Sequence, residues 1–66
     1  MTVKYPNVKV KLIGRDGNAF AIMGAVSNAM RKAGCTKEQI SEYTTAAMSG
    51  DYDNLLRVTA ETVDVS

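Results

Sequence analysis

Residues 8–26, VKVKLIGRDGNAFAIMGAV, pass from a strand pattern through a turn into a helix pattern, and this stretch decides the fold. Over residues 8–13, apolar and basic residues alternate, which predicts a strand with one face buried. Residues 14–18, GRDGN, contain types that tolerate positive φ or cap helices, so they predict a turn that starts a helix. The strand places Val8, Val10 and Leu12 on one face and Lys9, Lys11 and Ile13 on the other.

A first helix is predicted from Ala19 to Ala33, because apolar residues recur there at the spacing of one helix face. Gly34 is a natural stop, since glycine readily adopts the left-handed conformation that ends helices. The predicted buried face consists of Ile22, Val26, Ala29, Met30 and Ala33.

Two further helices are predicted after residue 35. TKEQ at residues 36–39 matches a capping box and begins a helix that runs to about Met48. Asp51 or Ser49 can cap the next helix. The predicted buried faces are Ile40, Tyr43 and Ala47 in the first of these helices, and Tyr52, Leu55, Leu56 and Ala60 in the second.

The last segment, Thr62 to Val65, alternates again and predicts a second strand, although the third helix could extend into it. The resulting order is β-α-α-α-β, an α+β fold in a single domain over residues 1–66, with the two terminal strands paired. A lone pair of strands is marginal in water, so we expect oligomerisation to complete the sheet.

The small size of the chain also favours self-association. With 66 residues, one cysteine (Cys35) and no histidine, it has neither an internal disulfide nor the usual zinc ligands to reinforce a small core. We therefore expect a homo-oligomer, either a dimer or a tetramer. The longest strongly apolar stretch, residues 19–26, is too short to span a bilayer, which predicts a cytoplasmic protein with no membrane partner.

Charge is distributed unevenly between the two halves of the chain. Residues 1–37 carry seven bases and one acid, whereas residues 38–66 carry one base and six acids. This asymmetry is consistent with an anionic ligand on the basic half, with docking between basic and acidic surfaces, or with faces that neutralise one another within the fold.

Residue chemistry argues against catalysis. A serine or cysteine nucleophile normally needs an orienting base, most often histidine, and the chain has none. Cys35 is expected to be a small buried residue, the alternative being a reactive thiol beside Lys32 and Lys37. Asp51 and Asp53 are interpreted as helix-start charges, the alternative being a weak magnesium site. We expect no catalytic residue, no metal and no cofactor.

Nucleic acid is disfavoured as a partner. The third helix would be the recognition helix of a helix-turn-helix motif, yet it carries Asp51, Asp53 and Glu61 against the single base Arg57. No aromatic residue separates Lys9 from Lys11, so the first strand offers no stacking platform for single strands.

The turn at residues 14–20 is the best candidate for a ligand site. A strand that enters a glycine-containing turn and then a helix directs free N–H groups outward, which suits phosphate. A simple strand-to-helix turn uses the same residues, so the structural interpretation stays open, and Phe20 is more often a core residue than a stacking one at such a position. The candidate ligand-binding residues are Arg15, Asp16, Gly17, Asn18 and Phe20 in the turn, with Lys9, Lys11 and Arg31 supplementing the charge.

Three segments carry a family resemblance over nearly the whole chain: GRDGNAFAI at residues 14–22, RKAG at 31–34 and SGDYDNLL at 49–56. In these segments the chain resembles a widespread group of very small bacterial and phage proteins. That group in turn resembles the anti-CBASS sponge proteins of tailed phages, which are oligomers that sequester nucleotide immune signals without cleaving them.

The resemblance implies a phage protein that acts in the host cytoplasm for immune evasion and binds a cyclic dinucleotide such as 3′3′-cGAMP, or a related nucleotide. The candidate residues above come from the turn and the basic face, not from the family. One departure is the low aromatic content, because purine binders commonly stack bases and this chain offers only Phe20, Tyr5, Tyr43 and Tyr52. The alternative functions are a protein interaction module that uses the basic and acidic halves, and a nucleic-acid-binding protein.

Overall fold

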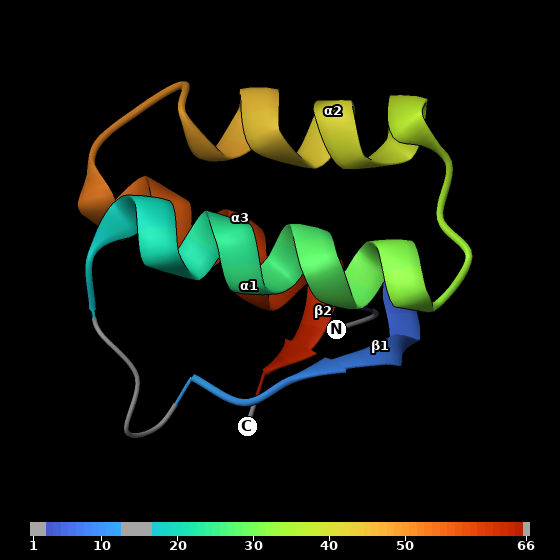
Figure 1. Cartoon of the computed structure of the whole chain (residues 1–66). Helices are drawn as coiled ribbons and strands as arrows, with labels where there is room; N and C mark the ends of the chain where they lie inside the picture. The colour runs from blue at the N-terminus through green and yellow to red at the C-terminus, as the bar shows by residue number, and fades with distance from the viewer. Residues whose placement is uncertain (1–2, 13–16, 66) are drawn as a thin grey trace.

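The computed structural model describes residues 3–12 and 17–65. Figure 1 shows the order of the elements, which confirms the predicted α+β fold of the β-α-α-α-β type. The elements within the described residues are β1 (Tyr5–Val10), α1 (Ala19–Lys32), α2 (Lys37–Ala47), α3 (Tyr52–Thr62) and β2 (Val63–Val65).

The terminal strands pair with each other, as predicted, and they run parallel. Lys9 aligns with Asp64 and Val10 with Val65, and the register is irregular between Tyr5 and Lys9. Parallel strands cannot be joined by a tight turn, so the chain must cross from one end of the pair to the other. Helices α1, α2 and α3 together form that crossover.

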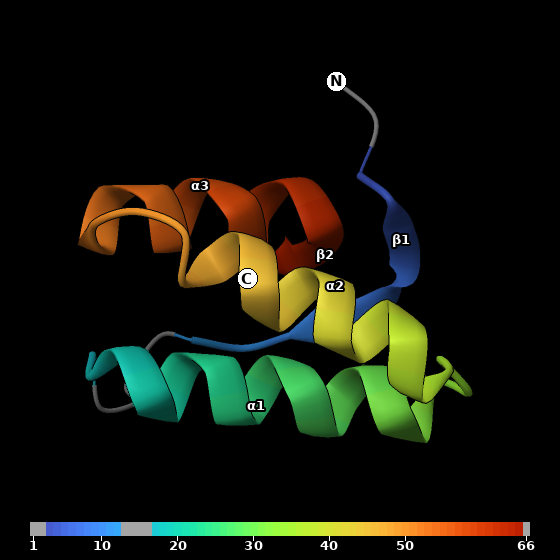
Figure 2. The ribbon, with the colours of Figure 1, turned by 90° about the horizontal axis from the view of Figure 1, so that it is seen from above.

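The elements stack in layers. In Figure 1, α2 lies above α1 and α3, and the strands lie below them. Seen from above in Figure 2, β1 passes between α1 and α3. Both strands therefore have helices on one side only, and the buried apolar residues fill the space between the strands and the helices.

Three strand boundaries differ from the prediction, and the first of these is the start of β1, which lies at Tyr5 and not at Val8. The first strand ends at Val10, so Leu12 follows it, and Ile13 lies outside the described residues. Thr62 belongs to α3, where its hydroxyl donates to the Val58 carbonyl at 2.6 Å. The extended backbone therefore begins one residue later than predicted, at Val63, which adopts φ −130° and ψ 163°.

The helix ends follow the predicted capping chemistry. The capping box is present, with the Thr36 N–H donating to Gln39 Oε1 at 2.7 Å and the Gln39 N–H donating to Thr36 Oγ1 at 3.2 Å. Asp51 caps α3 by accepting from the Asn54 N–H at 3.0 Å. Gly34 follows α1 with φ +92°, the left-handed conformation that glycine adopts without strain.

The buried faces of α1 and α2 follow the predicted spacing. Ile22, Val26 and Met30 are buried in α1, and Tyr43 and Ala47 in α2. Ala29 of α1 and Ile40 of α2 are half-buried, whereas Ala33, predicted to be buried, is the exposed C-cap of α1. Cys35, also expected to be buried, is half-buried against the core.

The predicted buried face of α3 is wrong except for Leu55. Tyr52, Leu56 and Ala60 are exposed, and the buried positions beside Leu55 are Thr59 and Thr62. Residues 55, 59 and 62 recur at helical spacing, whereas Leu56 is turned about 100° away from Leu55.

Threonine is tolerated in this core because its hydroxyl finds partners there. Thr59 Oγ1 lies 2.8 Å from the Leu55 carbonyl oxygen and 2.8 Å from Tyr43 Oη. A buried hydroxyl with hydrogen-bond partners avoids most of the cost of leaving water.

The two adjacent leucines of α3 should respond differently to truncation. Leu55→Ala removes a side chain that is 2% exposed and should lower the free energy of unfolding by about 2–5 kcal/mol. Leu56→Ala removes one that is 40% exposed and should cost less than about 1 kcal/mol. Melting temperatures of both variants check this; similar losses in the two variants would contradict the observed orientation of α3.

The Tyr43–Thr59 contact predicts a dependence of stability on alkaline pH. Burial raises the pKa of the Tyr43 hydroxyl above its usual 10.0, and the hydrogen bond with Thr59 lowers it in part. Because the folded state holds this proton more tightly than the unfolded state, its contribution is fully present below pH 10 and is lost as pH rises through the raised pKa.

Tyr43→Phe should therefore flatten the decline in unfolding free energy above pH 10 and cost about 1 kcal/mol at neutral pH. Urea denaturation of both proteins across pH 8–11 measures the two slopes. Equal slopes would show that the Tyr43 hydroxyl does not carry this dependence.

Candidate functional site

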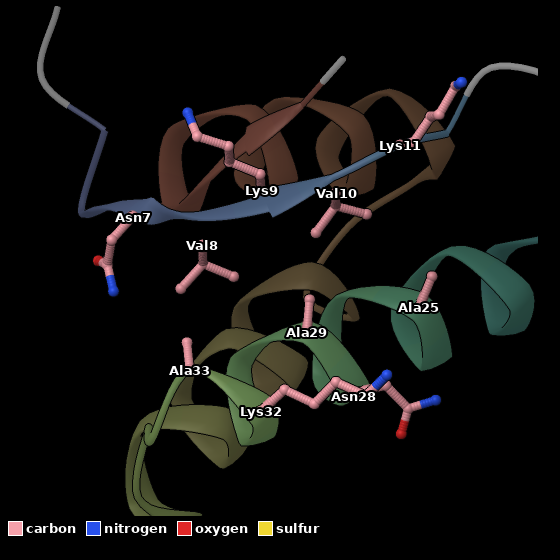
Figure 3. Close-up of a pocket in the computed structure, with 10 residues that line it drawn as sticks. All are labelled: Asn7, Val8, Lys9, Val10, Lys11, Ala25, Asn28, Ala29, Lys32 and Ala33. Carbon is pink, nitrogen blue, oxygen red and sulfur yellow. The ribbon is translucent and has the colours of Figure 1, made fainter.

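A groove of about 540 Å³ runs between β1 and α1 (Figure 3). We call it the β1–α1 groove. Its lining residues are Asn7, Val8, Lys9, Val10 and Lys11 from the strand segment and Ala25, Asn28, Ala29, Lys32 and Ala33 from the helix segment.

Short side chains create the groove. Ala25, Ala29 and Ala33 recur every four residues and therefore lie along one face of the helix segment. Figure 3 shows these alanines on the side of α1 that faces the strand, with Val8 and Val10 pointing from β1 toward the helix. Alanine methyl groups do not fill the space between the helix and the strand, so the floor of the groove is apolar and open.

The groove borders an edge of β1 as well as the face that points toward α1. Residues 7–11 line it consecutively, and consecutive residues of a strand point to opposite faces. Within the described residues, β1 has β2 as its single neighbour. No other described strand therefore pairs with the edge of β1 that borders the groove.

Amide and ammonium groups surround the apolar floor. Figure 3 shows Asn28 and Lys32 together on α1, with Asn7 on the strand. Asn28 Oδ1 accepts from Arg31 Nη1 at 3.1 Å, which leaves its amide nitrogen to donate elsewhere. Lys32 forms no ion pair with a described residue, so its charge is available to an anion.

Lys9 of β1 and Lys11, which follows the strand, contribute less directly. Lys9 and Lys11 point to the side of the strand opposite Val8 and Val10 in Figure 3. Lys9 Nζ forms an exposed ion pair with Asp64 Oδ2 at 2.9 Å. Even so, the described lining contains three lysines and no carboxylate, and with Lys9 paired to Asp64 it is chiefly the charge of Lys32 that favours an anion in the groove.

Two ion pairs also bear on the uneven charge of the chain. Lys9 pairs with Asp64, and Lys4 Nζ lies 3.3 Å from Glu42 Oε1. Both pairs join a base of the first half to an acid of the second half. Part of the asymmetry is therefore neutralised within the fold.

The predicted ligand-binding residues are spread over two regions of the molecule. Lys9 and Lys11 line the β1–α1 groove, and Arg31 lies beside it in the last turn of α1. Gly17, Asn18 and Phe20 lie at the start of α1, and Phe20 is about 18 Å along the helix from Lys32. Phe20 is 76% exposed and so is not a core residue. Arg15 and Asp16 lie outside the described residues.

Contacts within the chain occupy part of the turn that was predicted to hold phosphate. Asn18 Oδ1 accepts from the Phe20 N–H at 2.8 Å, and the Gly17 carbonyl accepts from the Tyr52 hydroxyl. The Phe20 N–H, which a phosphate at this helix start could use, is thus already satisfied. The contact between Gly17 and Tyr52 joins the start of α1 to α3.

The residue pattern of the sequence did not single out Asn7, Asn28 or Lys32 as ligand-binding residues. Lys32 and Asn28 lie on the flank of α1, where polar side chains are ordinary. The available signal was the four-residue repeat of alanines beside them, which indicates a helix face that approaches another element closely.

Comparison with protein-family models, curated proteins and solved structures finds no match to the chain. Its assignment to a sponge family therefore stays a prediction. Among the helices of the described residues, none has the length and apolarity needed to cross a membrane.

The start of α1 predicts a simple test of the capping interaction. Asn18→Ala removes the side-chain oxygen that accepts from the Phe20 N–H, and should lower the free energy of unfolding by about 1 kcal/mol. Asn18→Asp keeps the acceptor and adds a favourable charge at a helix N-terminus, so it should retain stability. Urea denaturation of the two variants measures the effect, and an Asn18→Ala protein as stable as the wild type would count against the cap.

Proposed function

We propose that the protein is a non-catalytic binding protein that holds a phosphate-bearing ligand of nucleotide size in the β1–α1 groove. The observation that carries the proposal is the combination of three lysines, two asparagines and an apolar floor, with no carboxylate among the described lining residues. Ammonium groups attract phosphate, and amides both donate to and accept from the edges of bases.

The size of the groove fits this ligand class. Small-molecule sites usually occupy about 300–1,000 Å³ and combine an apolar lining with a few polar groups. The groove, at about 540 Å³, lies within that range. Half-buried Ala25 and Ala29 offer an apolar surface to a base or sugar, while Lys32 and Asn28 lie where a phosphate and a polar edge of a base could bind.

The resemblance in the sequence narrows the proposal to a cyclic dinucleotide or a related signal, sequestered without cleavage. Ammonium, amide and alkyl groups at the groove suit binding, whereas hydrolysis would need a group that activates water. Assembly of several copies would raise the number of sites per particle, as a sponge requires.

The open edge of β1 favours a second candidate, an interaction protein that binds an acidic extended peptide. Such a peptide would add a strand beside β1, with its backbone bonded to the strand edge and its acids near Lys32 and Lys11. Pro6 and the register irregularity of β1 act against this, because both features hinder pairing along a strand edge.

A matched pair of lysine variants tests the ligand site. Lys32→Ala removes a cation from the groove and should weaken binding by about 1.5–3 kcal/mol, the range for a hydrogen bond to a charged group. Lys37→Ala removes another exposed lysine, at the start of α2 and outside the groove lining, and should leave affinity unchanged. Calorimetry with 3′3′-cGAMP, AMP, pyrophosphate and an acidic peptide measures both variants.

Amide chemical shifts then locate the ligand. A nucleotide in the groove should shift the signals of Val8, Val10, Asn28 and Ala29, and leave those of α2 in place. Binding of the peptide alone would select the second candidate. Equal effects of Lys32→Ala and Lys37→Ala, or shifts confined to the start of α1, would overturn the groove as the site.

A further inference from the structure

Four large apolar side chains are exposed at one end of the molecule. They come from the first turn of α1, the end of α2 and the first half of α3, which Figures 1 and 2 both place at the same end. Their exposed fractions are 76% for Phe20, 61% for Met48, 45% for Tyr52 and 40% for Leu56. We call these four residues the apolar end.

The apolar end is continuous and hollowed. Phe20, Met48 and Tyr52 line one cavity of about 290 Å³ together with half-buried Met23. Leu56 lies one helical turn after Tyr52, so it extends the same surface. Small proteins seldom leave a contiguous patch of this kind in water unless it serves an interaction.

A stripe of α1 continues this surface away from the apolar end. Phe20, Gly24, Ser27 and Arg31 recur at i, i+4, i+7 and i+11, so they lie along one side of the helix, apart from its buried face. A Cβ atom built at Gly24 would meet nothing within 4 Å. The absence of a side chain there is not required by packing within the chain, and it permits close approach of another helix.

Charges of opposite sign lie at the two ends of this surface. Asp51 lines the cavity of the apolar end, and Asp53 follows in the first turn of α3. Arg31 and Lys32 occupy the last turn of α1, at the far end of a helix about 21 Å long. A matching partner would place basic groups against the acidic apolar end and acidic groups against the basic far end.

We infer that this surface docks a second copy of the chain, with the two α1 helices crossing antiparallel at Gly24. In this arrangement Arg31 of one copy approaches Asp51 and Asp53 of the other, and the two-fold symmetry forms the same contact twice. Phe20 of each copy is covered by the stripe of its partner. Antiparallel helices also align their dipoles favourably.

The area of the surface is consistent with a dimer. The four side chains of the apolar end expose on the order of 400 Å², given that such a side chain presents about 150–250 Å² when free. Two copies would therefore cover about 800 Å², and the α1 stripe would bring the total toward the roughly 1,200 Å² of a small specific interface. The β1 edge, which carries Pro6 and a register irregularity, is less suited to this role.

Light scattering after size exclusion, over 5–200 μM, tests the inference. The wild type should have twice the 7.1 kDa mass of the chain. Phe20→Glu should return it to the mass of one chain across this range. Thr45→Glu, an exposed position on α2 outside the surface, should remain dimeric.

Gly24→Gln provides a second variant, which we expect to fold. Gly24 is exposed and has no neighbours that a side chain would meet, and glutamine has a higher helix propensity than glycine. This variant should dissociate the dimer while raising the melting temperature of the monomer. A monomeric wild type, or a dimer that survives both Phe20→Glu and Gly24→Gln, would overturn the inference.

Charge reversal tests the antiparallel orientation. Arg31→Glu and Asp53→Lys should each weaken dimerisation at least fivefold, and the double variant should recover most of that loss. A double variant as weak as the two single changes combined would rule out the crossing described here. Neither result depends on the ligand, so failure of the dimer and failure of the β1–α1 groove are distinguishable.

Discussion

The parallel pairing of β1 with β2 constrains every other element of this fold. A parallel pair needs a long connection, and in 66 residues that connection consumes most of the chain. α1, α2 and α3 must therefore cover the strands while they carry the chain between them. Val8, Val10 and Val63 are nearly fully buried where the strands meet the helices, so the sheet and the helical layer share one core.

Small side chains have a part in both this core and the proposed site. Small residues let elements of a short chain pack closely, as Ala47 does on the inner face of α2. On the flank of α1 the same residue type faces the strand edge, and there it leaves the β1–α1 groove. The apolar end follows from the same shortage of chain, because no described element covers Phe20 and Met48.

Features with local causes were predictable from the sequence. The capping box at Thr36 and Gln39, the cap at Asp51 and the stop at Gly34 each depend on residues within one turn of a helix. The buried face of α1 was also predictable, since Ile22, Val26 and Met30 are apolar and correctly spaced.

Features that depend on distant residues were not predictable. Leucine is more apolar than threonine, so hydropathy favoured Leu56 over Thr59, and the hydroxyl of Tyr43 that makes Thr59 acceptable lies on another helix. The parallel direction of the strands and the groove likewise follow from how α1 sits against β1. A four-residue repeat of alanines indicates that another element approaches the helix closely, but it does not indicate which element that is.

The pairing of Lys9 with Asp64 bears on the order of folding, because these residues are separated by 55 positions in the sequence. The hairpin of α1 and α2 and its junction with α3 involve short loops, whereas closing the sheet must order nearly the whole chain. We therefore expect the strands to join last during folding and to separate first in transient openings of the native state. Since β1 forms one wall of the groove, occupancy of the groove and closure of the sheet would be thermodynamically linked, and a ligand held there would oppose the opening of the sheet.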